Sequence, residues 1–228
     1  MSSTVVIAGV GPGLGASLAR KFADEGCSLG LFARSHAYVE SLADELPTPA
    51  VAAEVDVTDP EWVERGFERV RDELGPVDVL VNHASGASWN GLRDCSPHEF
   101  EHAWRVAAYG GFLCSKEAVE DMLDDGGTIL FTGATSAVRG RGGAVGFSSA
   151  KFAVRGLAES MARELGPAGI HVAHVVIDGG IRPPSRDVDS PEEYLDPDAI
   201  AESYWHLVEQ DESAWTLELD LRPHVEEF

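Results

Sequence analysis

Four glycines stand close together near the amino terminus, in the stretch AGVGPGLG over residues 8–15. They follow a β-branched apolar run and precede apolar residues at helical spacing. Glycine lets backbone amides approach a diphosphate, and a helix amino terminus attracts negative charge. This context predicts a dinucleotide-binding turn, and the alternative is a glycine-rich turn that binds nothing. Its predicted ligand-binding residues are Gly9, Gly11, Pro12, Gly13, Leu14 and Gly15.

A basic residue ends the second apolar run. The stretch LFARS places Arg34 nineteen residues after Gly15, with no acid beside it. At this place in dinucleotide sites an acid accepts from the 2′-hydroxyl of NAD, whereas an arginine accommodates the 2′-phosphate of NADP. We therefore expect NADP(H) rather than NAD(H). The alternative is that Arg34 is a solvated surface charge.

Lys151 is one of only three lysines in the chain, and Phe147 stands four positions before it. An ammonium group can donate hydrogen bonds to hydroxyls of a ligand. A phenyl ring has no proton to give or to take, so Phe147 cannot serve as an acid or a base. The pair therefore predicts a site that holds a ligand but lacks the ordinary means of proton transfer.

Apolar runs and helical patterns alternate along the chain. This alternation predicts an α/β fold, a single doubly wound Rossmann-type domain over residues 1–228 with a mostly parallel seven-stranded sheet and helices on both faces. The Pro-rich stretch 178–196 is predicted to be a loop or substrate lid. Strands are expected over 4–10, 27–33, 51–57, 77–83, 127–133, 170–177 and 215–221, and helices over 14–25, 60–74, 97–123, 147–165 and 197–210.

The net charge is −22, from 39 acidic and 17 basic residues. Nucleic acid is therefore not expected as a partner, since its binding needs clustered Lys and Arg. The acids are dispersed and lysine is scarce, which is typical of surfaces suited to concentrated salt. We hypothesise a halophilic source, and the alternative is an acidic mesophilic protein.

The three cysteines, Cys27, Cys95 and Cys114, are odd in number and show no CxxC spacing. This pattern predicts neither a disulfide framework nor a zinc site, and it favours a reduced cytoplasmic setting. No apolar run approaches the roughly 20 residues that span a bilayer, so no membrane association is expected. The stretch MSSTVVIAGVG is too short and lacks the basic start of a signal peptide.

Several stretches together resemble the short-chain dehydrogenase/reductase family. Gly9-x3-Gly13-x-Gly15 is similar to its glycine motif, and Asp56 and Val57 of DVTD resemble its adenine-contacting element. The resemblance covers about residues 4–183, and residues 197–221 fit the last helix and strand of the family.

The other resembling motifs lie beside the expected nicotinamide. Asn82-His83-Ala84-Ser85 resembles the NNAG motif, so Asn82 and Ala84 are implied cofactor contacts. Lys151 takes the place of the lysine in the YxxxK motif and is implied to hold the ribose. Gly179 and Ile181 of IDGGIRP match the PG-x-I/V-x-T segment. The resemblance implies hydride transfer between a nicotinamide cofactor and a carbonyl or alcohol.

The chain departs from the family pattern at the positions whose side chains transfer protons. Phe147 stands at the tyrosine position, Ala134 at the serine position and Ala107 at the asparagine position. A one-residue shift would let Thr135 replace the serine, which makes Thr135 and Lys151 the catalytic candidates. In the PG segment Asp178 replaces the proline and Pro183 the threonine.

Three functions fit this pattern. The first is an NAD(P)(H)-dependent oxidoreductase of low activity with altered acid–base groups, for which the further candidates are Ser148, Tyr109 and His83. His83 is either a group that titrates near neutral pH or a histidine packed near the cofactor. The second function is a non-catalytic NADP(H)-binding module, such as a sensor or partner subunit. The third is an enzyme of another class that uses the same pocket.

The expected partner is a small carbonyl or alcohol substrate. Trp89 and Phe147 are predicted either to stack against a flat or apolar substrate or to belong to the core. The resemblance also implies a homodimer or homotetramer. The helices expected over 97–123 and 147–165 carry apolar residues that serve either such an interface or the core.

Overall fold

Seven strands form one parallel sheet in the order β3-β2-β1-β4-β5-β6-β9. The computed structural model describes residues 3–86, 88–185 and 187–226. The central strands β1, β4, β5 and β6 are buried almost throughout, which explains their continuously apolar sequences. The strands are β1 Thr4–Ala8, β2 Ser28–Ala33, β3 Ala50–Glu54, β4 Val79–Asn82, β5 Gly127–Thr132, β6 Ile170–Ile177 and β9 Glu218–Leu221.

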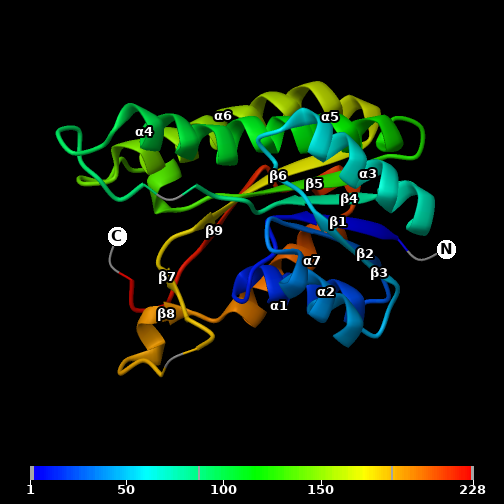
Figure 1. Cartoon of the computed structure of the whole chain (residues 1–228), viewed down its shortest axis with the longest axis horizontal. Coiled ribbons are helices and arrows are strands. Elements are labelled where there is room, and N and C mark those ends of the chain that lie inside the picture. The colour runs from blue at the N-terminus through cyan, green and yellow to red at the C-terminus, as the bar shows by residue number, and fades with distance from the viewer. Residues whose placement is uncertain (1–2, 87, 186, 227–228) are drawn as a thin grey trace.

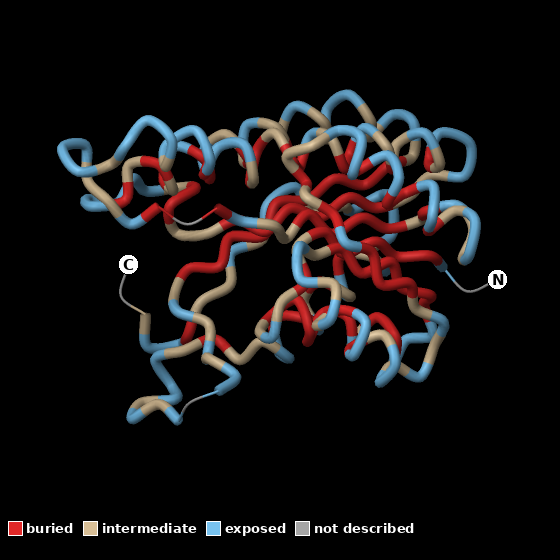
Figure 2. Tube along the Cα trace, viewed as in Figure 1, coloured by how far each residue is buried: buried red, intermediate tan, exposed pale blue. Residues whose placement is uncertain are grey.

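Helices cover both faces of the sheet (Figure 1). Each face has its own apolar core, and the buried residues concentrate in the sheet between the two helical layers (Figure 2). The predicted doubly wound α/β fold is therefore confirmed. One layer contains α1 Leu14–Asp24, α2 His36–Glu45 and α7 Pro197–Val208, and the other contains α3 Pro60–Leu74, α4 Pro97–Trp104, α5 Gly110–Met122 and α6 Val145–Leu165.

Two helical features differ from the expectation. Helix α2 was not expected, and it buries only Val39 and Leu42, so its apolar stripe is too narrow to show a helical period. The helix expected over 97–123 is divided by a π-helical segment, η1, over Arg105–Tyr109. Such segments are rare and occur mostly near functional sites. The 3₁₀ turns are η2 Thr135–Ala137, η3 Gly166–Ala168, η4 Pro191–Glu193 and η5 Glu212–Ala214.

The segment 178–196 contains some regular structure, although a loop was expected. β7 Gly180–Ile181 and β8 Tyr194–Leu195 form a parallel pair beneath the sheet in the view of Figure 1. An ion pair between Arg182 and Asp196 joins the two ends of the segment between β7 and α7. Among the described residues, no helix is both long and apolar enough to cross a membrane.

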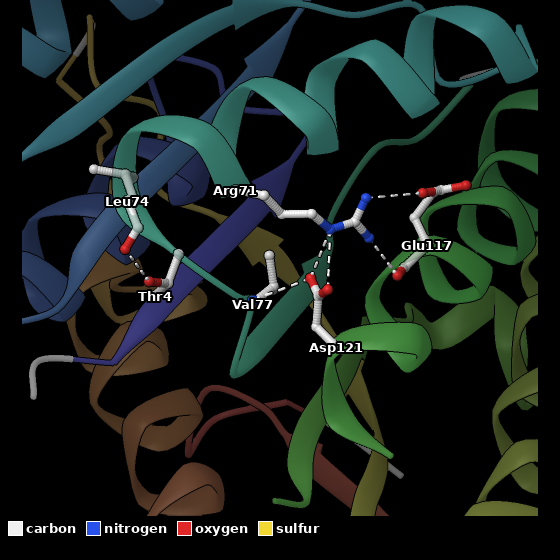
Figure 3. Close-up of polar contacts among 6 residues, drawn as sticks. All are labelled: Thr4, Arg71, Leu74, Val77, Glu117 and Asp121. Atoms are coloured by element: carbon white, nitrogen blue, oxygen red, sulfur yellow. Dashed lines mark hydrogen bonds and ion pairs between the residues drawn. The ribbon is translucent and has the colours of Figure 1, made fainter. Parts of the chain in front are cut away.

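A cluster of polar contacts near the amino end of β4 holds helices α3 and α5 together (Figure 3). The Arg71 side chain donates from Nε to both carboxylate oxygens of Asp121 at 3.0 Å. Arg71 also donates to the backbone oxygen of Glu117 at 2.8 Å, and the Val77 amide donates to Asp121 at 3.1 Å. The cluster therefore ties α3, α5 and the start of β4 together.

Candidate functional site

The four glycines of the turn have different surroundings. A Cβ atom on Gly9 would lie 2.5 Å from the Cα of Ala84, and one on Gly15 would lie 3.0 Å from the Cα of Val10. These two glycines are explained by packing within the protein, and Gly9 also has φ of 102°. A Cβ on Gly11 or Gly13 would meet no protein atom within 4 Å. Packing does not explain those two glycines, but the close approach of a ligand would.

The amino terminus of α1 opens onto the same turn. Gly13 is the N-cap residue, so no side chain caps the first amides of the helix. The first turn also contains no acidic residue. The positive end of the helix dipole is therefore uncompensated there, which is the environment that binds phosphate groups.

A cavity of about 470 Å³ extends from the turn along the carboxyl ends of β1, β2 and β4. It brings together seven of the predicted cofactor residues: Gly9, Gly11, Pro12, Arg34, Asp56, Val57 and Ala84. Several other residues also line the cavity although the sequence did not indicate them, and they flank the predicted ones in the chain. They include Phe32, Ser35, Tyr38, Ser85 and Val106.

Arg34 and Asp56 give this cavity its charge. Arg34 is exposed and forms no ion pair with any described residue. Burial opposes ionisation of Asp56, but hydrogen bonds from the Thr58 amide and hydroxyl, with the charge of Arg34, hold the pKa of Asp56 below its usual range. Ser35 is the N-cap residue of α2, and its hydroxyl makes no capping hydrogen bond.

A second cavity, of about 920 Å³, lies between the turn and the 178–196 segment. Its walls include Gly13, Ser17 and Arg20 on one side and Arg182 and Asp198 on the other. The predicted lid segment therefore lines a cavity beside the amino terminus of α1.

Six predicted cofactor residues line neither cavity. Leu14 and Gly15 pack under the turn, and Asn82 is buried, with its amide donating to the Ser115 hydroxyl at 3.0 Å. A Cβ atom on Gly179 would lie 2.9 Å from the Pro223 side chain and 3.0 Å from that of Leu195, so this glycine packs against β8 and the C-terminal segment. The six residues are Leu14, Gly15, Asn82, Lys151, Gly179 and Ile181.

Lys151 is buried at the carboxyl end of β5. Its Nζ donates to the backbone oxygen of Thr132 at 2.8 Å and lies 5.7 Å from the centre of the Phe147 ring. No carboxylate within the described chain forms an ion pair with it. Burial lowers the pKa of Lys151 to about 8, so the group is mostly protonated at neutral pH.

Phe147 forms an aromatic group with Trp89 rather than entering the core. The two ring centres are 4.8 Å apart, and the Arg141 guanidinium lies 5.6 Å from the Trp89 ring. Trp89 is 57% exposed and Phe147 is half-buried. This arrangement excludes Trp89 from the core and leaves an aromatic surface one helical turn from Lys151.

The hydroxyl of Thr135 is already engaged. It donates to Asp178 at 2.6 Å, and the same buried carboxylate pairs with Arg139 at 3.4 Å and with Arg222 at 3.3 Å. While Asp178 is ionised, Thr135 has no free proton for a ligand oxygen. Ala134, its neighbour, offers no hydroxyl.

The other acid–base candidates lie in different surroundings. Ala107 is buried within the π-helical segment, and Tyr109 stacks with Trp104 and Phe112 among exposed aromatic residues of that layer. The Ser148 hydroxyl accepts from the Arg141 amide at 3.1 Å. None of these candidates forms a hydrogen bond with Lys151 in the described chain.

His83 does not titrate near neutral pH, contrary to one of the two expectations for it. Desolvation of the ring and the positive charge of Lys151 lower its pKa to about 4. Its Nδ1 lies 3.1 Å from the Thr132 hydroxyl. Among the described residues, no group of three or more His, Cys, Asp or Glu side chains is placed to hold a metal ion.

Residues 3–190 match the sequence model of the family described as short chain dehydrogenase. The chain belongs to this family. Its oxidoreductase relatives include the meso-2,3-butanediol dehydrogenase of Serratia marcescens, 33% identical over 76% of this chain and 70% of the relative. The versicolorin reductases of Emericella nidulans and Aspergillus parasiticus are 27% and 29% identical, and those matches span 53% of each relative's length.

Solved structures of family members superpose on nearly the whole chain. A short-chain dehydrogenase from Rhodopseudomonas palustris is 33% identical, with a TM-score of 0.86 over 97% of this chain and 99% of that one. An alcohol dehydrogenase from Thermococcus sibiricus, in complex with 5-hydroxy-NADP, gives 0.90 at 27% identity, over 100% and 99% of the two chains. A 3-ketoacyl-(acyl-carrier-protein) reductase from Brucella melitensis, in complex with NADH, gives 0.89 at 25% identity, over 97% of each chain. The fold therefore binds nicotinamide cofactors of both kinds.

Proposed function

We propose that this short-chain dehydrogenase binds NADP(H) along the glycine turn and transfers hydride, at a low rate, between the nicotinamide and a carbonyl or alcohol. The observation that carries the proposal is the free space around Gly11 and Gly13 at the uncapped end of α1. Two linked phosphates fit a turn where backbone amides are open and a side chain would intrude.

Three features support NADP(H) over NAD(H). Arg34 reaches the cavity wall without an ion-pair partner in the described chain, and Ser35 has a hydroxyl free of capping bonds. The amino terminus of α2 follows at once, with no acidic residue in its first turn. A 2′-phosphate carries nearly two negative charges, and these groups would bind it by charge, hydroxyl and helix dipole together.

Lys151 is the residue that we expect to hold the ribose next to the nicotinamide. When bound, the nicotinamide supplies the hydride chemistry. The ammonium of Lys151 keeps two further donor hydrogens besides the one bonded to Thr132. Phe147 does not ionise and Thr135 donates to Asp178, so neither of these two residues supplies a proton to a substrate oxygen. The remaining rate advantage comes from positioning the reactants.

The engaged hydroxyl of Thr135 also supports a second function, a NADP(H)-binding module without turnover. In that case the cleft binds the nucleotide, and no substrate reacts. The two functions differ in one measurable respect, which is whether restoring a proton donor restores catalysis.

Phe147→Tyr tests this difference. Its phenol would lie beside the Lys151 ammonium, which lowers the pKa of a neighbouring hydroxyl and makes it a proton donor. We expect kcat/KM for NADPH-dependent reduction of diacetyl or benzaldehyde to rise about 100-fold, the lower range for a positioned acid. The reaction is followed in molar KCl by the loss of NADPH absorbance.

Phe152→Tyr is the matched control, because Phe152 lies on the same helix and is 44% exposed, and as the next residue after Lys151 it points to a different side of the helix. It should leave the rate unchanged. If Phe147→Tyr gains nothing while NADPH still binds, the oxidoreductase proposal fails and the binding module replaces it.

We also propose that two or four copies associate through the layer of α4 and α5. Trp104 and Phe112 are 43% and 45% exposed and both stack with Tyr109, which leaves an apolar surface on that layer. We further propose that residues 1–228 form a single domain. The free cysteines support a cytoplasmic location, because a reducing compartment keeps thiols unpaired.

A further inference from the structure

Three side chains form a buried hydrogen-bonded chain beneath the catalytic edge of the sheet. The Tyr204 hydroxyl of α7 lies 2.8 Å from the Thr132 hydroxyl at the end of β5. The Thr132 hydroxyl lies 3.1 Å from Nδ1 of His83, just beyond the end of β4. Tyr204 is 0% and Thr132 is 7% exposed, so water does not replace these bonds.

The protons in this chain can be assigned by requiring an acceptor for each. The Tyr204 hydroxyl has no hydrogen-bond partner in the described chain other than Thr132, so its proton must go to Thr132. The Thr132 proton then has Nδ1 of His83 as its acceptor. The reverse direction would leave the buried Tyr204 proton without an acceptor, which is unfavourable.

This direction fixes the tautomer of His83. Nδ1 accepts a hydrogen bond and carries no proton, so in the neutral ring the proton is on Nε2. Nε2 bonds to none of the described residues, and His83 is only half-buried. His83 therefore presents one N–H donor whose partner is not part of the described chain.

The location of His83 indicates what that partner is. Its backbone amide donates to Ala8 at 2.9 Å, and the next residue, Ala84, packs against Gly9 and lines the 470 Å³ cavity. On the other side, the backbone oxygen of Thr132 accepts from Lys151. His83 itself lines neither of the two cavities described above, but its backbone connects the end of β4 to Ala84, and its ring contacts Thr132, whose backbone oxygen accepts from Lys151.

We propose that His83, held as the Nε2–H tautomer by Thr132 and Tyr204, donates a hydrogen bond to a ribose or phosphate oxygen in the nicotinamide half of the bound dinucleotide. The proposal rests on the proposed function, because it takes the cleft to bind NADP(H). His83 acts here as a neutral donor and not as an acid. Its pKa of about 4, lowered by desolvation and by the Lys151 charge, keeps the ring uncharged across the neutral range.

The tautomer is tested without any ligand. Two-bond proton–nitrogen correlation spectra of the ¹⁵N-histidine-labelled protein distinguish Nε2–H from Nδ1–H rings. We expect wild-type His83 to be Nε2–H, and Tyr204→Phe to convert it partly to Nδ1–H, because Thr132 is then free to accept from the ring. A wild-type ring protonated on Nδ1 would overturn the inference whatever the cofactor does.

The donor role is tested by the affinity for NADPH. We expect His83→Leu to raise the Kd about tenfold, the effect of one lost hydrogen bond to a charged ligand. Tyr204→Phe, which leaves His83 in place, should raise the Kd about threefold and serves if His83→Leu does not fold. His206→Leu, at an exposed histidine of α7, is the control and should not change the Kd.

The outcomes separate the two proposals. If the wild type does not bind NADPH, the proposed function fails, and the spectra alone judge the tautomer. If the wild type binds NADPH and both His83→Leu and Tyr204→Phe bind it equally well, His83 is not a donor to the nucleotide and the inference is wrong.

Discussion

At the scale of single residues, Lys151 is a buried charge whose proposed role in holding the ribose lowers the stability of the fold. An ammonium in the interior is unfavourable without a charged partner, and among the described residues Lys151 contacts only the Thr132 carbonyl and the Phe147 ring. Because its pKa is about 8 in the folded chain and 10.5 when the side chain is in water, the unfolded state binds its proton more tightly. The lysine therefore destabilises the fold below pH 8, and this penalty disappears as the pH rises towards 10.5.

Lys151→Met should consequently stabilise the protein while weakening its ligand site. The pKa of Lys151 is lowered from 10.5 to about 8, and removing this penalty stabilises the fold. After the loss of the hydrogen bond to Thr132 is subtracted, about 2 kcal/mol of added stability remains at pH 7. Denaturant unfolding at pH 7 and pH 10 should show a large gain at the lower pH and little at the higher. Lys116→Met, at an exposed lysine of α5, is the control. A loss of stability in Lys151→Met at pH 7 would show that the lysine is not a buried, unpaired charge.

At the scale of elements, substitutions in the glycine turn distinguish glycines needed for packing from glycines needed for ligand binding. We expect Gly11→Ala to leave the unfolding free energy within about 0.5 kcal/mol of wild type, because its Cβ would meet no protein atom. Its Kd for NADPH, measured by fluorescence, should rise tenfold or more, since the methyl group would occupy the path of the phosphates. Gly156→Ala, at an exposed position inside α6, is the control for the added methyl group. Unchanged affinity in Gly11→Ala would place the phosphates elsewhere.

The same scale shows what the sequence can predict. The seven strands follow from buried apolar runs, and the glycine turn from its place between a strand and a helix. Helix α2 escapes prediction because its stripe consists of Val39 and Leu42 alone. The hydrogen bonds that engage the candidate catalytic hydroxyls cannot be predicted from the sequence either, because they join residues far apart in the chain. Thr135 meets Asp178 across 43 positions, and Thr132 meets Tyr204 across 72.

At the scale of the whole molecule, the net charge of −22 opposes the compact state in dilute buffer. Raising KCl from 0.1 M to 2 M shortens the screening length from about 10 Å to below 3 Å, which removes most of the repulsion between dispersed carboxylates. We expect the melting temperature to rise by about 10 °C over this range. Sorbitol at equal osmolarity, which does not screen charge, should give a smaller rise. A melting temperature independent of KCl would contradict the halophilic hypothesis.

We expect the turn leaving β1 to hold the linked phosphates of a nicotinamide dinucleotide, with Arg34 selecting NADP(H). Isothermal titration calorimetry with NADPH and NADH side by side, in 2 M KCl, tests it most directly. The structure predicts one NADPH per chain with a Kd of about 1–100 μM, and at least tenfold weaker binding of NADH. The absence of binding heat with both dinucleotides would contradict the account.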